Sequence, residues 1–381
     1  IPPEEVASGP VEETVETGAD IDVTAFPAPR WHENDGGRYI GTADVVITRN
    51  AETGRVNAAT YRVQVHGPDE VTVYMSPGKD GLINQRSHLE RGEPAPFVIV
   101  AGAPPILFTG ANERISAHVN ELEYVGGRLG EPIEVITGTE TGLPIPARSE
   151  LVLEGHLYPE TDPVVEGPFG EWTGYYAGGE NTLRPVTVER VYHRADPILT
   201  GIHLTYPDGR AQAGTVMKSV GRIWADLERT GIPGVRALNG LMPNSWLTVV
   251  AIDQQYPGHA KQVGLDVFSS TTGAYHGRFV LIVDDDIDVF DWGQVLWAMC
   301  SRADPERDIE VIENCWSTPL DPTIPPERRD RDDYSNSRAI IDATRPYHWR
   351  EAFPETTKLS EELRAELEST WQSVLDGGAV E

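Results

Sequence analysis

Short β-branched runs separated by glycine and proline fill the first half of this chain, and they limit the folds open to it. Between residues 36 and 214 these runs include "TADVVIT", "VTVYM", "FVIVAGA" and "LRPVTVERVYHR". Such runs, bounded by turn residues, are typical of strands. Their density favours a barrel or a sandwich over a doubly wound sheet. Residues 1–35 are rich in Glu, Pro and Gly, and we expect an irregular N-terminal segment there.

A change of pattern near residue 214 predicts a second domain. Residues 215–231 carry apolar side chains at helical spacing and end at a glycine, which indicates a connecting helix. Strand-like and helix-like segments then alternate through 232–355, as in an α/β domain. Within 356–381, "SEELRAELESTWQSVL" begins with a Ser/Glu capping box and predicts an amphipathic helix. That helix is suited to packing on its own chain or on a partner's.

Charge and cysteine content exclude several classes of protein. The formal net charge is −29, so we expect no nucleic-acid partner, because phosphate binding requires a basic patch. No apolar run approaches the roughly 20 residues of a membrane helix, and no signal-peptide pattern is present. Two cysteines are too few for a disulfide framework. We therefore expect a cytoplasmic protein with no membrane partner.

The string "EGPFGEWTGYY" places two carboxylates, Glu166 and Glu171, on either side of Gly-Pro-Phe-Gly. Proline and glycine exclude a helix here, so a stiff loop is expected to hold both acids, and such loops often carry function. Three other segments contain groups that could meet these acids: "NAATYR" (57–62), "SPGKDG" (76–81) and "HVNELEYVGG" (118–127). Taken separately, each segment is better explained by surface ion pairs and turn chemistry than by a functional role.

Eight strings, in order along the chain, resemble the UbiD family of prenylated-flavin decarboxylases. They are "PAPRWHENDGGRYIG", "YMSPGKDG", "TGLPIPA", "EGPFGEWTGYY", "YPGHAKQ", "VDDDID", "STPLDPTIPP" and "NSRAIIDATRP". The resemblance implies an α+β or α/β fold: a split β-barrel that binds flavin over 36–214, the connecting helix, and a C-terminal α/β domain. It also implies an N-terminal region shorter than is usual in the family.

Carried onto the matching positions, the resemblance implies a network of Arg62, Glu166 and Glu171 beside a prenylated FMN. Glu171 would donate a proton, while Arg62 and Glu166 would position it and the substrate carboxylate. Two close carboxylates cannot both ionise cheaply, so one pKa should rise while the arginine keeps the other group charged. An acid poised near neutral pH suits protonation of a carbanion-like carbon. A buried ion-pair network without a catalytic role is the competing interpretation.

The resemblance also implies metal ions at the flavin phosphate. Asn57, Asp80 and Glu121 would bind Mn²⁺ or Mg²⁺, and Asp80 stands where the family normally has a histidine. An all-oxygen set suits a hard ion, but the aspartate adds a negative charge next to an anionic phosphate. A potassium ion would lie near Ala111 and Glu121.

Three further residues, besides Arg62, would contact the cofactor. Tyr61, Arg62 and Lys79 are expected beside it, and Lys261, in "YPGHAKQ", resembles the lysine that contacts the flavin phosphate. A point-charge lysine is a reasonable phosphate partner. A surface lysine after a turn is the alternative for Lys261.

The expected activity is non-oxidative decarboxylation, in either direction, of an aromatic, heteroaromatic or α,β-unsaturated carboxylic acid. Leu265 and Val267 would line the pocket for a planar ring, although a place in the core is equally compatible with them. Alternatives are a prenylated-FMN-dependent hydrolase or other non-decarboxylating lyase, and a cofactor-free subunit of a decarboxylase complex. Expected partners are a UbiX-type flavin prenyltransferase, which would supply the cofactor, and further copies of the chain as a homodimer or larger assembly.

Overall fold

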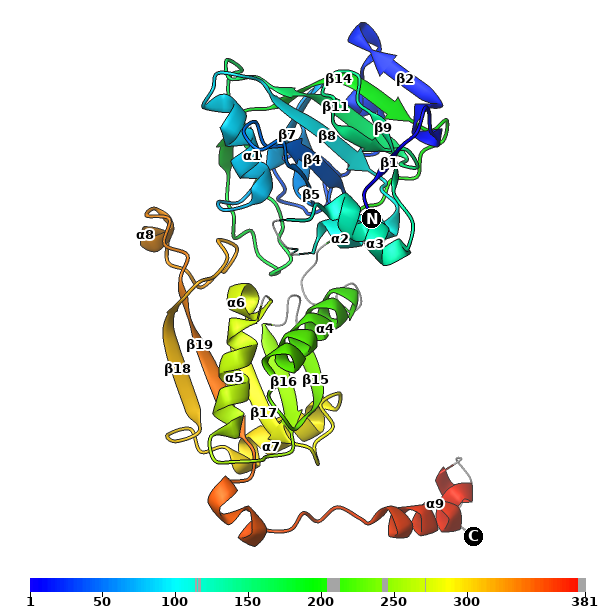
Figure 1. The fold of residues 1–381 in the computed structure, drawn as a ribbon. Helices are drawn as coiled ribbons and strands as arrows, with labels where there is room; N and C mark the ends of the chain where they lie inside the picture. Colours follow the sequence, from blue (N-terminus) through cyan, green and yellow to red (C-terminus); the bar gives the residue numbers. More distant parts are fainter. Residues whose placement is uncertain (114, 116–117, 204–212, 242–245, 271, 376–381) are drawn as a thin grey trace.

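The computed structural model describes residues 1–381 except 114, 116–117, 204–212, 242–245, 271 and 376–381. Two lobes follow one another along the chain, and a helix near the C-terminus stands apart from both (Figure 1). Within the described parts, no helix has both the length and the apolar character needed to cross a membrane.

A curled nine-stranded sheet forms the N-terminal lobe. Its strand order is β3-β6-β7-β14-β11-β8-β4-β5, with β2 paired to β14. The strands are β2 Thr14–Thr17, β3 Arg38–Gly41, β4 Val45–Arg49, β5 Val56–Ala59, β6 Arg62–Val65, β7 Glu70–Tyr74, β8 Ala95–Ala101, β11 Leu151–Leu157 and β14 Val186–His193. Two short sheets complete the lobe, one of β1 Glu4–Glu5, β9 Glu134–Thr137 and β10 Pro144–Pro146, the other of β12 Val164–Glu166 and β13 Asn181–Leu183.

The strands of this lobe are apolar on both sides because both faces of the sheet are covered. Successive side chains of a strand point to opposite faces. Val46 accordingly packs in the core inside the curl, while Val45 and Ile47 pack in a second core with Leu107 and Leu122. Those two leucines belong to α2 Pro105–Ala111 and α3 Glu121–Leu129, and a third helix, α1, spans Asp80–Leu89. The expected β-rich domain is therefore present, with three helices that turn signals alone did not predict.

The structure differs from the irregular segment expected over residues 1–35. Strand β1 pairs in parallel with β9, and β2 pairs with β14. Val11 and Val23 are fully buried in the two cores of the lobe. These strands have two and four residues, too few to show a clear period in the sequence. The segment is part of the lobe.

The C-terminal lobe is an α/β domain, as expected. It begins with α4 Ala213–Thr230, close to the predicted connecting helix. Its five-stranded sheet has the order β15-β16-β17-β19-β18, in which β16, β17 and β19 are parallel and the two edge strands are antiparallel. The strands are β15 Val235–Leu241, β16 Leu247–Ile252, β17 Phe279–Asp284, β18 Ile309–Cys315 and β19 Asn336–Ala343.

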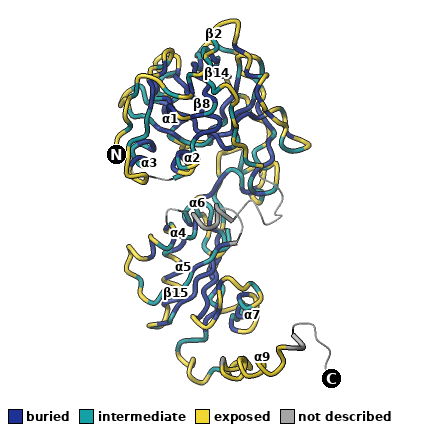
Figure 2. Tube along the Cα trace, turned by 90° about the vertical axis from the view of Figure 1, so that its right-hand side faces the viewer, coloured by how far each residue is buried: buried dark blue, intermediate teal, exposed yellow. Residues whose placement is uncertain are grey.

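Helices cover both faces of this second sheet. Val250 packs with α4 and α5 His259–Ser269 on one face, and Val249 packs with α7 Trp292–Arg302 on the other. Two short helices, α6 Gly273–His276 and α8 Pro326–Arg329, lie toward the N-terminal lobe (Figure 1). The last helix, α9 Glu361–Leu375, is exposed from Glu362 to Gln372 (Figure 2).

The two lobes touch through aromatic side chains. The Lys79 ammonium, at the start of α1, lies 5.4 Å from the ring centroid of Tyr275 in α6. Trp172, one residue after Glu171, packs edge to face on Trp246, with ring centroids 5.3 Å apart. The loop that carries the two acids therefore lies where the lobes meet.

Candidate active site

The structure brings Arg62, Glu166 and Glu171 into direct contact. Arg62 opens β6, Glu166 closes β12, and Glu171 lies in the loop beyond, which has no regular secondary structure over 167–171. Arg62 donates from Nε and Nη2 to the two oxygens of Glu166, at 2.7 and 2.8 Å. It also donates from Nη1 to Glu171 Oε1. All three side chains are buried, so one guanidinium links two carboxyl groups in a site with little water.

Glu166 is anchored more firmly than its neighbour. Besides the two bonds from Arg62, its carboxylate accepts a bond from the Tyr39 hydroxyl and another from Asn181 Nδ2, each 3.0 Å long. Glu171 accepts one hydrogen bond on its carboxyl, from Arg62, within the described part of the chain. The arrangement therefore favours a fixed carboxylate at Glu166 and a less constrained carboxyl at Glu171.

The electrostatics separate the two acids further. Burial raises the pKa of Glu171 to about 7; the charge of Arg62 opposes this rise, and the charges of Glu166 and Asp35 add to it. Burial alone would lower the pKa of Arg62, but the bonds with Glu166 and the charge of Glu171 outweigh it and raise that pKa. Arg62 therefore stays cationic, while Glu171 is partly protonated near neutral pH.

Aromatic rings wall the guanidinium on its faces. The Arg62 Cζ atom lies 4.1 Å from the ring centroid of Tyr74 and 5.4 Å from that of Phe169, within cation–π range. Sequence analysis missed Tyr39, Tyr74 and Asn181. Tyr74 is the cross-strand partner of Arg62, and Asn181 is that of Glu166. Only the register of strand pairing identifies Tyr74 and Asn181, and no local motif contains that register.

Of the three residues predicted to bind a metal, Asn57 and Glu121 are in direct contact, and Asp80 is near enough for its charge to affect Glu121. Asn57 lies in β5, Asp80 begins α1 and Glu121 begins α3. Asn57 Nδ2 donates to Glu121 Oε1 at 3.1 Å, and Ala58 N–H donates to Glu121 Oε2 at 2.9 Å. Burial raises the pKa of Glu121, and the negative charge of Asp80 adds to that rise. The Tyr61 hydroxyl accepts the N–H of Gly81 beside them, at 3.2 Å.

The donor set fits a hard cation. Asn57 Oδ1 is buried and has no hydrogen-bond partner among the residues described, which leaves an amide oxygen available to a ligand. Glu121 is buried, whereas Asp80 is partly exposed. The described ranges contain no cluster of three or more His, Cys, Asp or Glu side chains suited to a metal. A hard cation takes about six oxygen ligands, so two carboxylates and an amide would leave coordination positions for a phosphate or water.

The structure does not bring Lys261 to this group. Lys261 Nζ pairs with Glu310 Oε2 of β18 at 2.7 Å. It lies in the first turn of α5, whereas α6, which contacts Lys79, follows the last turn of the same helix. Val267 is 1% exposed and packs in the core of the C-terminal lobe, so it does not line a pocket. Leu265 is 44% exposed on the same helix.

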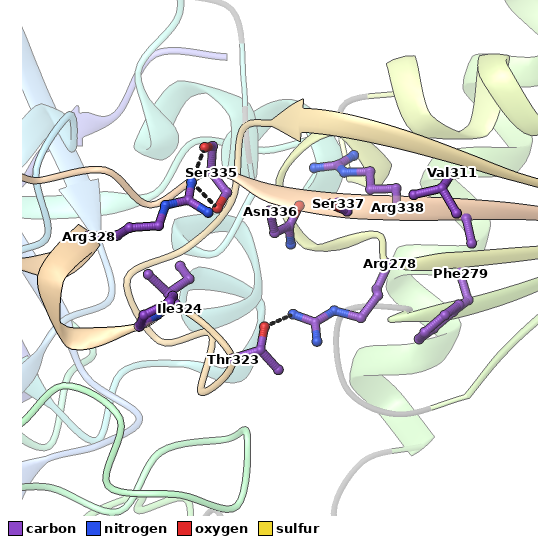
Figure 3. Close-up of a pocket in the computed structure, with 12 residues that line it drawn as sticks. Arg278, Phe279, Val311, Thr323, Ile324, Arg328, Ser335, Asn336, Ser337 and Arg338 are labelled. Carbon is purple, nitrogen blue, oxygen red and sulfur yellow. Dashed lines mark hydrogen bonds between the residues drawn. The ribbon is translucent and has the colours of Figure 1, made fainter.

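A cavity of about 460 Å³ lies apart from these residues, in the C-terminal lobe (Figure 3). Phe279, Ile324 and Ala339 give it an apolar lining, and Arg278 and Arg328 stand at its sides. Arg278 pairs with Asp321, and Arg328 pairs with Asp333. None of the residues predicted for catalysis or cofactor binding lines this cavity. The chemistry is therefore sought at the Arg62 network.

Comparison with known proteins gives one consistent family. Residues 4–207 match the profile described as the 3-octaprenyl-4-hydroxybenzoate carboxy-lyase Rift-related domain, and residues 214–343 match the C-terminal domain of the same enzyme, the two UbiD profiles. Among curated proteins, a phenolic acid decarboxylase of Sedimentibacter hydroxybenzoicus is 32% identical over 356 residues, covering 91% of this chain and 72% of that protein. One from Streptomyces sp. (strain D7) is 30% identical over 355 residues, with the same coverage.

Solved structures agree with the sequence comparison. The vanillic acid decarboxylase of S. hydroxybenzoicus in its closed form superposes with a TM-score of 0.81 at 30% identity, covering 97% of this chain and 79% of that one. The UbiD-class enzyme HmfF from Pelotomaculum thermopropionicum, in complex with FMN, gives a TM-score of 0.82 at 25% identity, covering 97% and 80%. Both lobes and their order are therefore shared with these enzymes.

Proposed function

The chain belongs to the UbiD family of carboxy-lyases, and from this premise we propose that it decarboxylates an aromatic carboxylic acid with a prenylated FMN held beside Arg62, Glu166 and Glu171. The names of its relatives support the substrate class, since they include phenolic acid and vanillic acid decarboxylases. The structural relative HmfF supports the cofactor class through its complexes with FMN and prFMN.

One observation carries this proposal: a buried arginine joins two carboxyl groups that differ in their hydrogen-bond partners, and the pKa of one of them, Glu171, is raised. Glu166 accepts four hydrogen bonds and acts as the fixed counter-charge of Arg62. Glu171 Oε1 accepts from Arg62, so the proton of the neutral acid resides on Oε2. A pKa of about 7 keeps that proton available at neutral pH.

The prenylated flavin, when bound, supplies an electron sink for the electrons left by loss of carbon dioxide. The protein orients the reactants, excludes water and delivers the proton. Arg62 stays cationic between its two partners and is placed to attract a substrate carboxylate toward them. Glu171 then protonates the carbon from which carbon dioxide has left.

Asn57, Asp80 and Glu121 would hold Mn²⁺ or Mg²⁺ at the phosphate end of the cofactor, with Tyr61 and Lys79 close by. Arg55 balances the extra charge of Asp80 through an ion pair. A potassium ion near Ala111 and Glu121 belongs to the same proposal. Lys261 is left out of it because its ammonium pairs with Glu310.

The proposed partners follow from the cofactor and from α9. A UbiX-type flavin prenyltransferase would supply the prenylated flavin, and the thiols of Cys300 and Cys315, both free, are consistent with work in the cytoplasm. Leu363, Leu367 and Trp371 are exposed at spacings of four residues on α9, so they share one side of the helix. We propose that this stripe packs on another copy of the chain.

Replacement of Glu171 tests the proposal most directly. Glu171→Gln keeps the shape but removes the proton, so turnover should fall by about 10²–10⁴-fold while the absorbance of bound flavin stays. Release of carbon dioxide, trapped during turnover, identifies the reaction as a decarboxylation. Glu180→Gln is the matched control, since Glu180 is exposed near the same loop. Full activity of Glu171→Gln would contradict the assignment.

A further inference from the structure

Glu166 and Glu171 are positioned in different ways. The carboxylate of Glu166 is fixed by four hydrogen bonds to its own oxygens, whereas Glu171 accepts one on its carboxyl within the described structure. A carboxyl that must hold and release a proton needs a free oxygen. Its position therefore has to be set through its backbone. Glu171 itself bonds to Gly174 and Tyr175 in a turn, whereas residues 167–170 before it have no regular secondary structure.

A buried aspartate holds the residue just before Glu171. Asp35 is 2% exposed. Its Oδ1 accepts the N–H of Gly170 at 2.9 Å, and its Oδ2 accepts the N–H of His32 at 2.8 Å. The Nδ1 atom of His32 lies 3.3 Å from the same Oδ2. Both oxygens of Asp35 are thus engaged, and one of them holds the acidic loop through a charge-assisted bond.

Residues 32–36, which we call the clamp segment, approach the loop at three more consecutive positions, 167–169. Gly36 N–H donates to Pro168 O at 2.7 Å. The His32 ring packs edge-on against Phe169, with centroids 5.8 Å apart and planes at 81°. A Cβ on Gly36 would lie 1.7 Å from Gly167 O, so glycine is required for the two backbones to approach. The clamp segment therefore meets the loop residue by residue.

We propose that Asp35, oriented by His32, is a positioning residue for proton transfer: it fixes the backbone of loop 167–171 and thereby sets where Glu171 presents its proton. This inference rests on the proposed role of Glu171 as proton donor. Asp35 bonds to Gly170 and His32 and not to the carboxyl of Glu171, so its geometric effect on Glu171 is transmitted through Gly170.

Asp35 also contributes charge. The groups that face Glu171 are Arg62 from β6, Glu166 from β12, Tyr74 from β7 and Asp35 from the clamp segment. The negative charge of Asp35 disfavours ionisation of Glu171 and adds to the rise of its pKa. Removing this charge therefore moves the ionisation of Glu171 to lower pH.

Asp35→Asn tests both effects, because asparagine keeps the size, removes the charge, and has only one oxygen to accept the two N–H groups, of Gly170 and His32, that the aspartate holds. In hydrogen–deuterium exchange of the full chain, amides of residues 167–175 should exchange at least about tenfold faster, while β8 and β11 stay protected. The flavin-loaded variant should lose about tenfold to a hundredfold in kcat/KM. The alkaline limb of its pH profile should move to lower pH.

Glu33→Gln is the matched control, because Glu33 is an exposed acid in the same segment; it should leave the exchange and the pH profile unchanged. Unchanged exchange over 167–175 in Asp35→Asn would overturn the proposal, and so would a loss of rate with an unmoved alkaline limb. If Asp35→Asn does not fold, His32→Asn removes the ring on Phe169 and should speed exchange over 167–175. Wild-type protection there would overturn the proposal.

The exchange measurement does not depend on turnover. If Glu171→Gln remains active while Asp35→Asn loosens the loop, the clamp exists and the assigned proton donor is wrong. If Glu171→Gln is inactive and Asp35→Asn leaves the loop protected, the proposed function stands and the positioning role of Asp35 fails.

Discussion

Arg55 and Asp80 form an ion pair, with 3.2 Å between Nη1 and Oδ2, next to the cluster of Asn57 and Glu121. The family resemblance places a neutral histidine at position 80, so the arginine offsets the charge that the aspartate adds. The pair is partly exposed, and its contribution to stability is therefore small. Its consequence is chemical: a carboxylate remains available to a metal over a wider pH range than an imidazole.

Metal binding should depend on Asp80. In the presence of FMN, Asp80→Ala should weaken Mn²⁺ binding by about tenfold or more. The electron paramagnetic resonance signal of free Mn²⁺ measures this binding. Asp80→His should bind Mn²⁺ at pH 8 but lose it as the pH falls through about 6.5, where histidine protonates. Wild-type binding should persist to lower pH than binding by Asp80→His. Glu52→Gln, an exposed acid on the preceding turn, is the control; unchanged affinity in Asp80→Ala would show that this residue is no ligand.

The alkaline limb of the pH–rate profile should report Glu171. Its pKa of about 7 means that the protonated fraction falls tenfold per pH unit well above pH 7, so kcat/KM should fall likewise. Glu166→Gln removes a neighbouring negative charge and should move the limb to lower pH. Measurements of kcat/KM from pH 5.5 to 9 check both expectations. A rate that stays constant up to pH 9 would be incompatible with Glu171 as the acid.

Stability should fall with pH because of Asp44. This residue is 1% exposed before β4, and both carboxyl oxygens are buried without a hydrogen-bond partner among the described residues. Burial raises its pKa well above the ordinary value, so the folded state binds a proton that the unfolded state releases above about pH 4. The contribution of Asp44 to the free energy of unfolding is therefore greatest at low pH and decreases as the pH rises toward the raised pKa.

Asp44→Asn should remove this dependence. Relative to the wild type, Asp44→Asn should raise the unfolding free energy by about 1–3 kcal/mol more at pH 8 than at pH 5. An energy of this size is typical of an unpaired buried polar group. Thermal unfolding at the two pH values measures the difference. Asp69→Asn, on an exposed aspartate, should show no such gain, and an equal effect of both substitutions would remove the assignment to Asp44.

Assembly should depend on α9. Deletion of residues 356–381, or replacement of Leu363, Leu367 and Trp371 by serine, should convert the oligomer into a monomer in sedimentation velocity. Both changes remove the exposed apolar side chains that we propose pack on a second copy of the chain. Glu366→Gln, at an exposed position of the same helix, serves as the surface control. A wild-type chain that is monomeric at micromolar concentration would rule out this role of the helix.

Local sequence signals predicted the elements well where they were long and periodic. The helix over 215–231 and the alternating second lobe were predicted by spacing, and α4 covers Ala213–Thr230. The contact of Arg62 with Glu166 spans 104 positions, so no local signal contains it, and it was expected because the motifs resemble a family. The side chains that surround this contact depend on strand register, which is set by tertiary packing.

Lys261 is a residue for which the matching motif and the fold point to different places. The motif around Lys261 matches the family. However, Lys261 lies in the first turn of α5, at the end of that helix away from α6, and its ammonium forms an ion pair with Glu310. Val267 was equally compatible with core and pocket in the sequence, and packing against the sheet decided for the core. Residue type alone does not specify which end of α5 lies near the N-terminal lobe, or which side of α5 packs against the sheet.

The loop of Glu171 is shared between two halves that fold around separate cores. Trp172 packs on Trp246 of the second half, and Arg329 Nη1 donates to Ala177 O at 2.9 Å. A chimera that exchanged the second half for that of a relative would therefore alter the support of the acid even if every residue of the first half were retained. Recombination between family members is constrained at this seam, and compatible donors are those that keep an aromatic ring at 246 and an arginine at 329.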